Sequence, residues 1–370
     1  MDVSPASLIA SDVASAMLGS ALARRLLADG LALIRRAPGE DARRWRRHRL
    51  AGREHLFAQP LTLTPYAASA PCSARCHFCS ENLRRLDGAP TPALLRPDAR
   101  YFAGLRQALG ELRGLPRSYS LSGLEASDDA DWLLQLLACL SDPADLPDVE
   151  QRVLYSNGAG LAAARGAQLL TALERFGLSW LELSRHHHEA EANQRIMRFR
   201  PGLAVAGGEG FHALLRDVAG RFPVQLVCLL QRGGIDSPQG VARYLDWAAR
   251  LGVCGVIFRE LSRLDQGYRA NATARYVEER RVSLEPLLQA CLDDRELGLA
   301  PQALTDGYYF WNLRLRHRSG LQVVFECSDY RVMHRRHAED RVYKLVYFAN
   351  GQLCAGWQPG RDVLLETGHG

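Results

Sequence analysis

The chain has 370 residues, of which 47% are hydrophobic, and its formal net charge is +5 at neutral pH. Such a composition suits a globular protein with a large core, and no apolar stretch approaches the roughly 20 residues of a membrane-spanning helix. The N-terminus carries Asp2 and no basic segment followed by an apolar one, so we expect no secretory signal and a cytoplasmic location. The mild positive charge does not favour nucleic acid as a partner.

Cysteine and lysine usage exclude two further classes of protein. The nine cysteines are odd in number, and outside one cluster they are scattered singly, which argues against a disulfide framework. Lys344 is the single lysine. Because a pyridoxal phosphate enzyme needs a Schiff-base lysine, and Lys344 lies in a C-terminal strand pattern, chemistry with that cofactor is disfavoured.

Residues 1–58 are rich in Ala, Leu and Arg, and apolar residues recur at helical spacing around Leu18, Ala21, Leu26 and Leu33. This pattern predicts a helical N-terminal extension. Its run 43–49 is the densest positive charge in the chain and could contact a phosphate or an acidic partner, or form a solvated helix face.

Residues 59–265 show short β-like runs separated by helical stretches, which is typical of repeated βα units and a parallel sheet. We expect strands at 61–64, 118–122, 153–155, 180–184, 224–230 and 255–258, and helices near 98–113, 128–140, 160–175, 210–221 and 238–251. Residues 266–370 predict a helix near 283–297 and antiparallel strands at 312–318, 321–326, 342–348 and 352–357. The pairs Ser319-Gly320 and Asn350-Gly351 are hairpin turn signals.

Three cysteines follow the first expected strand. Cys72, Cys76 and Cys79 have the spacing C-x3-C-x2-C, with Phe78 before the third. Four thiolates would complete the protein ligands of a [4Fe-4S] cluster, whereas three leave one iron open. By itself the triplet also fits a structural zinc site with His77 or a remote cysteine as the fourth ligand.

The spacing and the aromatic residue resemble the radical S-adenosylmethionine (radical SAM) superfamily. The resemblance implies one [4Fe-4S] cluster on Cys72, Cys76 and Cys79, with S-adenosylmethionine on the open iron, and a partial (β/α)6 TIM-type barrel spanning residues 59–265. The 266–370 tail would then cover the open side of that barrel. In pattern the chain is closest to the molybdopterin-precursor cyclase-like branch, without the C-terminal auxiliary cluster of that branch.

The resemblance also assigns residues to S-adenosylmethionine. Gly123, Leu124 and Glu125 match the Gly-Gly-Glu element, with a leucine in place of the second glycine. Ser184 matches the serine of the fourth strand, and Leu261 falls near a residue that packs on adenine. The family's aromatic position before the third cysteine is Phe78.

The remaining strand ends supply candidates for substrate binding, because functional residues of parallel barrels lie at the carboxyl ends of the strands. Ser156 and Asn157 end the third strand, and Glu182, Arg185, His186 and His187 lie in or just after the fourth. Arg259 ends the sixth strand. Arg314, Arg316 and Arg318 form a stripe on one face of a tail strand, which could bind an anion or protect an exposed edge.

These features predict a biosynthetic radical SAM enzyme that abstracts hydrogen from a small substrate carrying a carboxylate or phosphate. An external donor such as flavodoxin or ferredoxin would supply the electron. Two alternatives stay open. One is a radical SAM enzyme that modifies peptides, disfavoured by the lack of auxiliary cysteines and of a leader-binding domain before the barrel; the other is a non-catalytic iron-sulfur or zinc protein.

Overall fold

The computed structural model describes residues 20–35, 41–83, 96–264, 268–337 and 341–367. Residues 1–19 and 36–40 of the expected N-terminal extension, including Leu18, therefore lie outside the described residues. In the parts that are described, no helix is both long enough and apolar enough to cross a membrane.

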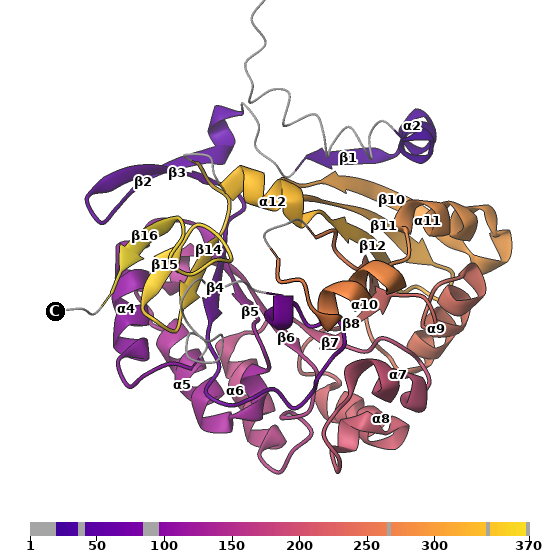
Figure 1. The fold of residues 1–370 in the computed structure, drawn as a ribbon, viewed down its shortest axis with the longest axis horizontal. Coiled ribbons are helices and arrows are strands. Elements are labelled where there is room, and N and C mark those ends of the chain that lie inside the picture. Colours follow the sequence, from indigo (N-terminus) through magenta and orange to yellow (C-terminus); the bar gives the residue numbers. More distant parts are fainter. Residues whose placement is uncertain (1–19, 36–40, 84–95, 265–267, 338–340, 368–370) are drawn as a thin grey trace, which may run out of the picture.

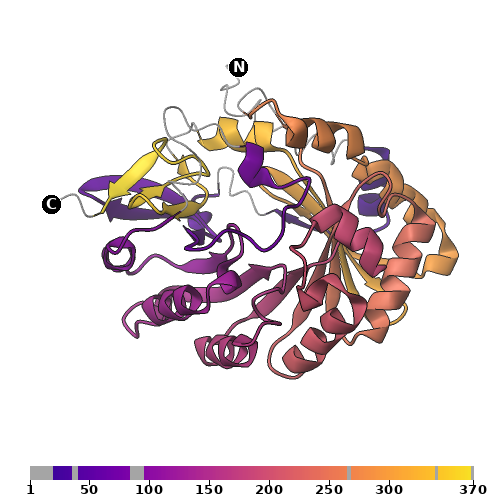
Figure 2. The ribbon, with the colours of Figure 1, turned by 60° about the horizontal axis from the view of Figure 1, so that its bottom comes forward.

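Six parallel strands form the middle of one 13-stranded sheet. They are β4 (Thr62–Tyr66), β5 (Arg117–Leu121), β6 (Val149–Ser156), β7 (Trp180–Ser184), β8 (Val224–Leu230) and β9 (Gly255–Glu260). The connecting helices are α4 (Tyr101–Glu111), α5 (Ala130–Leu140), α6 (Gly166–Phe176), α7 (Ala190–Met197), α8 (Gly208–Val218) and α9 (Pro238–Arg250). The sheet curves, with α4, α5, α6, α8 and α9 on its outer side (Figures 1 and 2), whereas α7 ends beside the loop that carries the three cysteines. The predicted mixed α/β fold with a partial barrel is confirmed.

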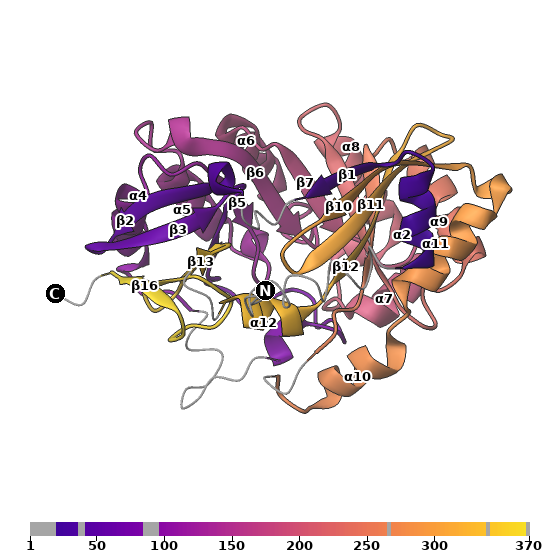
Figure 3. The ribbon, with the colours of Figure 1, turned by 90° about the horizontal axis from the view of Figure 1, so that it is seen from above.

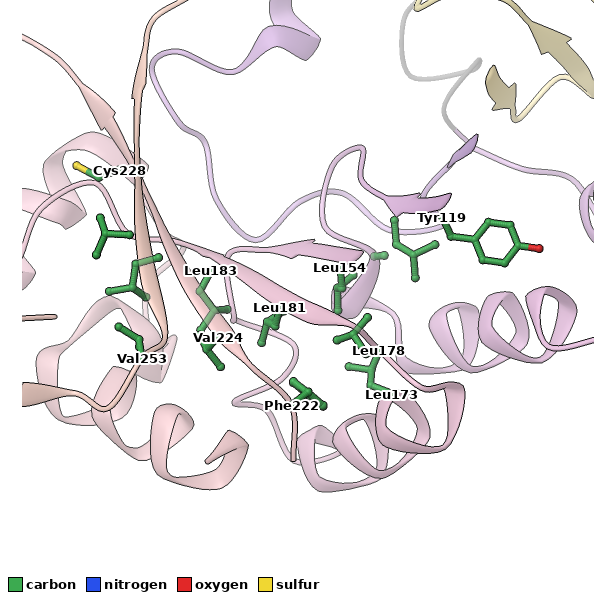
Figure 4. Packing of buried hydrophobic residues seen from close by; sticks show 14 of the residues in the cluster. Tyr119, Leu154, Leu173, Leu178, Leu181, Leu183, Phe222, Val224, Cys228 and Val253 are labelled. Carbon is green, nitrogen blue, oxygen red and sulfur yellow. The ribbon is translucent and has the colours of Figure 1, made fainter. Parts of the chain in front are cut away.

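Local chemistry explains several helix boundaries. Asp129 accepts a hydrogen bond from the Trp132 amide at 3.1 Å and so begins α5. Ser237 caps α9, where Pro238 occupies the first helical position. Figure 4 shows Leu154 of β6, Leu181 of β7 and Leu173 of α6 in the apolar layer between sheet and helices, and all three are fully buried. Because helices cover this face of the sheet, its strands must be largely apolar. Such apolar runs made β7 and β8 predictable from the sequence.

The N-terminal segment is only partly helical. After α2 (Ala21–Ala28) it forms β1 (Ala32–Arg35), β2 (Trp45–Leu50) and β3 (Arg53–Ala58), so the expectation of a helical extension is wrong for these strands. β1 pairs with a strand some 270 residues away in sequence, at Ala303 to Asp306, and β2 and β3 form a hairpin turned at Ala51 and Gly52, both with positive φ. In this segment, pairing with neighbouring strands outweighs the helix propensity of the residues. Figure 3 shows β1 and the β2–β3 hairpin at different sides of the molecule.

The C-terminal tail contains both expected hairpins, but it does not form a separate cover. Its strands are β10 (Leu299–Asp306), β11 (Phe310–His317), β12 (Gln322–Ser328), β13 (Arg341–Val342), β14 (Leu345–Phe348), β15 (Gln352–Cys354) and β16 (Val363–Glu366). β12 pairs in parallel with β9, and β14 pairs in parallel with β4, so the tail extends both edges of the barrel sheet. Helices α10 (Ala272–Arg280) and α11 (Leu284–Asp293) precede these strands, and α12 (Tyr330–His337) lies between the two edges (Figure 1).

The arginine stripe of β11 does not reach the barrel interior. Arg314 and Arg316 are exposed, and Arg318 approaches Asp246 of α9 at 3.6 Å. β11 is hydrogen-bonded to β10 on one side and β12 on the other, so it is not an edge strand. The expectation of a protected edge is therefore wrong, and the stripe does not line the cavity at the ends of the parallel strands.

Candidate active site

A cavity of about 400 Å³ lies at the carboxyl ends of the parallel strands. It is lined by the cysteine loop after β4 and by residues that end five further strands. The expected site residues along its wall are Cys72, Cys76, Phe78, Cys79, Gly123, Leu124, Glu125, Ser156, Asn157, Ser184, His186, Arg259 and Leu261. Most of the residues singled out in the sequence thus meet in one place, where parallel barrels carry their function.

The three thiols lie close to one another. Burial raises the pKa of Cys72 to about 12, and it also raises the pKa of Cys76, to which the neighbouring Cys79 and Cys72 add. The Ala74 amide lies 3.4 Å from the Cys72 sulfur, and the side-chain amide of Asn157 lies 3.7 Å from it. N–H donors directed at sulfur favour a thiolate, the form that binds metal.

Neighbouring elements hold the backbone of the cysteine loop from two sides. The Arg200 guanidinium donates to the carbonyls of Pro71 and Cys72, at 3.0 and 2.9 Å. The Ser73 amide donates to the Asp128 carboxylate at 2.6 Å. The loop is therefore positioned by backbone contacts that leave its sulfurs facing the cavity.

The loop after β5 has an uncommon backbone. Gly123 has φ +105° and Leu124 has φ +51°, so two successive residues adopt left-handed conformations. A Cβ atom at Gly123 would lie 2.3 Å from the Tyr66 ring, so this position requires glycine. Leu124 stands where the family pattern has a second glycine, and its side chain packs against a small cluster that includes Tyr66 and Phe348. That packing offsets the roughly 1–2 kcal/mol that a left-handed leucine costs.

Glu125 ties the loop after β5 to the end of β6. Its carboxylate accepts hydrogen bonds from the Ser127 hydroxyl at 2.6 Å, the Ser156 hydroxyl at 2.8 Å and the Asn157 amide. Burial raises the pKa of Glu125 to about 7, although these donors oppose the shift. Asn157 also donates to the Ser73 hydroxyl at 2.9 Å. Ser156 and Asn157 therefore support Glu125 and the cysteine loop.

His186 presents a donor to the cavity. Its Nδ1 accepts the Leu229 amide at 3.1 Å, which places the proton of the neutral ring on Nε2. Burial, helped by the cations of Arg185 and Arg259, lowers the pKa of His186 to about 3, so the ring stays neutral at physiological pH. Phe78 meets this ring edge-to-face at 4.8 Å, which joins the cysteine loop to the end of β7.

Arg259 is the candidate cation that lines the cavity. Its Nε donates to the Glu326 carboxylate of β12 at 2.8 Å. Burial opposes the charge, but the carboxylates of Glu326 and Glu182 outweigh it and raise the pKa of Arg259. Its two Nη groups make no hydrogen bond within the described residues. Glu182 does not line the cavity; it is buried, accepts from the Trp180 indole at 3.2 Å and influences the site through Arg259.

Arg185 and His187 lie outside the cavity, so the expectation that they face the substrate is wrong. The Arg185 guanidinium lies 4.6 Å above the Phe211 ring and donates to the carbonyls of His187 and Val205. Burial lowers its pKa to about 10. His187 stacks on His188 at 4.5 Å, on a loop. Residues that follow a strand can turn away from the barrel, which strand periodicity does not reveal.

The tail contributes cavity residues that sequence reasoning missed. Tyr268, Tyr330, Met333 and Trp357 line the wall opposite the barrel strands. Tyr66 of β4 is also part of the wall, and its hydroxyl donates to Glu81. The tail's aromatic content was the available signal, but only the pairing of β12 and β14 with the barrel edges places it here.

The described side chains around the cysteine loop do not converge on a single metal ion. Within the described ranges, no group of three or more His, Cys, Asp or Glu side chains is arranged to hold one metal ion. His77 stacks on Tyr276 at 4.9 Å. The thiolates of a four-iron cluster bind different irons and so lie farther apart than the ligands of a single ion.

Comparison with known proteins gives matches among solved structures only. No protein-family model and no curated protein sequence matches the chain. Streptococcus suis SuiB bound to S-adenosylmethionine has a TM-score of 0.46 at 14% identity, over 80% of this chain and 60% of that one. The structure of native anSMEcpe with bound AdoMet has a TM-score of 0.42 at 14% identity, over 54% and 51%.

A third match is coproporphyrinogen III oxidase HemN from Escherichia coli, described as a radical SAM enzyme, with a TM-score of 0.39 at 13% identity. It covers 69% of this chain and 66% of that one. The chain spans about half the length of the anSMEcpe structure and 60% of SuiB. Likenesses at this level say nothing about activity or substrate.

Proposed function

We propose that this protein is a radical SAM enzyme acting on a small molecule. The observation that carries the proposal is that the C-x3-C-x2-C loop and the ends of the parallel strands line one cavity. Cys72, Cys76 and Cys79 would hold one [4Fe-4S] cluster with an open iron. When bound there, the cluster and S-adenosylmethionine together supply reductive cleavage to methionine and a hydrogen-abstracting 5'-deoxyadenosyl radical.

The donor set fits such a cluster. Three thiols from one loop face the cavity, and the Asn157 amide and the Ala74 N–H approach the Cys72 sulfur. Hydrogen bonds to cluster sulfurs tune the potential of iron-sulfur centres. Arg200 and Asp128 hold the loop backbone, so the thiols are positioned before any metal binds.

For S-adenosylmethionine, the supporting residues are Gly123, Leu124, Glu125, Ser184 and Leu261, all on the cavity wall. The left-handed backbone at Gly123 and Leu124 orients peptide groups that could accept from an ammonium. The buried carboxyl group of Glu125 lies beside them, and an ammonium bound there would favour its ionised form. Phe78 and the tail aromatics exclude water from the same space.

For the substrate, Arg259 supports a carboxylate or phosphate. Glu326 fixes the guanidinium through Nε and leaves the Nη pair available for a bidentate contact. The neutral His186 adds an Nε2–H donor. We further propose an external one-electron donor, because cleavage of S-adenosylmethionine consumes an electron.

Metal analysis tests the cluster. After anaerobic reconstitution we expect four irons and four sulfides per chain, and near-complete loss of both in Cys72→Ala, Cys76→Ala and Cys79→Ala. Cys254→Ala is the matched control, since that cysteine is exposed and does not line the cavity. Stoichiometric zinc without iron would replace the proposal with a zinc-binding protein.

A further inference from the structure

Four exposed arginines surround the cysteine loop on the protein surface. Arg75 lies in the loop itself, Arg198 and Arg200 follow α7, and Arg280 ends α10. We call them the basic patch. Elsewhere on the surface some exposed arginines, such as Arg25 and Arg165, are paired with aspartates, whereas others, such as Arg314 on β11, form no ion pair to the described residues. No member of the basic patch forms an ion pair within the described parts of the chain.

Contacts place each member beside the loop. Arg200 donates to the Pro71 and Cys72 carbonyls, and the Arg75 amide donates to the Arg198 carbonyl at 3.2 Å. On the other side of the loop, His77, between Cys76 and Cys79, stacks at 4.9 Å on Tyr276 of α10, the helix that ends at Arg280. The four cations therefore border the segment that carries the thiols.

Acidic groups nearby leave this charge largely uncompensated. Asp128 lies near Arg200, but its carboxylate already accepts the Ser73 amide. Glu278 and Glu279 are exposed next to Arg280 in α10, without forming an ion pair to it. A surface on which positive charge predominates attracts a partner of the opposite sign and raises the rate of encounter.

We propose that the basic patch docks an acidic one-electron redox protein. This inference rests on the proposed function, since it concerns delivery of the electron to the cluster. One electron leaves the reduced partner, which is oxidised, and enters the cluster, which is reduced; no bond forms or breaks at the interface. The cysteine loop itself reaches the surface at Pro71, Arg75 and Ser80, so a partner seated on its basic border would lie close to the cluster ligands.

The test removes the charge without removing the fold. The variant combines Arg75→Gln, Arg198→Asn and Arg280→Gln, because asparagine tolerates the left-handed backbone of Arg198 at φ +54°. Arg200 is kept because it supports the loop. The matched control combines Arg24→Gln, Arg314→Gln and Arg316→Gln, three exposed arginines on α2 and β11.

The probe is an acidic flavodoxin. Its association with the metal-free chain is measured by calorimetry, and its reduction of the reconstituted cluster by stopped-flow absorbance. At low ionic strength we expect the variant to bind flavodoxin at least about 10-fold more weakly than wild type, and its cluster to be reduced by flavodoxin at least about 10-fold more slowly. Binding of flavodoxin by the wild-type protein should weaken as salt rises. The control should match wild type.

Reduction by the methyl viologen radical cation separates this inference from the proposed function. If the viologen reduces the cluster in variant and wild type alike, a flavodoxin effect confined to the variant supports the docking site. Equal flavodoxin binding by variant and wild type would overturn it, as would equal losses in variant and control. So would tighter binding of an acidic peptide than of flavodoxin. A chain that takes up no cluster would instead overturn the proposed function.

Discussion

The two halves of the cavity differ in how their polar groups are used. In the half that carries the cysteines, Glu125, Asn157 and Ser156 bond to one another or to the loop. In the half that carries Arg259 and His186, one side of each group is anchored, by Glu326 and by the Leu229 amide, while the other side makes no hydrogen bond to the described residues. The first half holds its own loop in place, and the second keeps donors for a ligand.

The largest effect should come from a substitution in the half that carries the cysteines, where the polar groups hydrogen-bond to one another. Glu125→Ala would leave the Asn157 amide and the Ser156 hydroxyl buried without their acceptor. We expect the free energy of unfolding of the metal-free protein to fall by about 3 kcal/mol or more. Denaturant unfolding measures this. Glu279→Ala, at an exposed position in α10, should stay within about 0.5 kcal/mol of wild type, and an equally small change for Glu125→Ala would refute the role of its hydrogen bonds.

A substitution of Arg185 should lower the stability of the fold without affecting substrate binding. Arg185→Ala removes the ring contact with Phe211 and two hydrogen bonds to backbone carbonyls, so unfolding should become easier by about 2 kcal/mol. Since Arg185 lies outside the cavity, turnover per folded molecule should stay within about threefold of wild type. Arg216→Ala on the surface of α8 is the control. A large loss of turnover with unchanged stability would return Arg185 to the substrate site.

Arg259 tests the ligand-facing half. Arg259→Lys keeps the charge beside Glu326 but loses the guanidinium fork, so anionic substrates should be used about 10-fold less efficiently. The measurement uses small carboxylates and phosphates that accelerate 5'-deoxyadenosine formation by the wild-type enzyme. Cluster content should be unchanged, and Arg316→Lys should behave as wild type. If the accelerating compounds prove to be uncharged, or are unaffected by the change, the anion assignment is wrong.

His186 gives an effect that is confined to acidic pH. Its folded pKa of about 3 lies below the ordinary value of 6.5, so the unfolded chain takes up a proton first as pH falls. Stability from this group is complete above pH 6.5 and declines between pH 6.5 and 3, by up to about 1.4 kcal/mol per pH unit. His186→Asn retains an acceptor for the Leu229 amide but cannot titrate. Its unfolding free energy should therefore depend less steeply on pH in this window, and equal slopes would contradict the assignment.

Sequence patterns predicted the barrel well because each βα unit is local. β7 and β8 were expected at the residues where they occur, and the motifs after β4, β5, β6 and β9 reach one cavity. The N-terminal and C-terminal segments were harder to predict, because β1, β12 and β14 pair with strands far away in sequence. Side-chain direction after a strand was also beyond reach: of the consecutive residues Arg185, His186 and His187, only the middle one faces the cavity.

Reductive cleavage of S-adenosylmethionine tests the central claim most directly. The anaerobically reconstituted protein, given dithionite and S-adenosylmethionine, should form 5'-deoxyadenosine even without substrate, and Cys76→Ala should form none. Chromatography measures the product, with an established radical SAM enzyme run alongside. Formation that depends on all three cysteines is the predicted result. An intact cluster that yields no 5'-deoxyadenosine while the reference enzyme does would contradict the account.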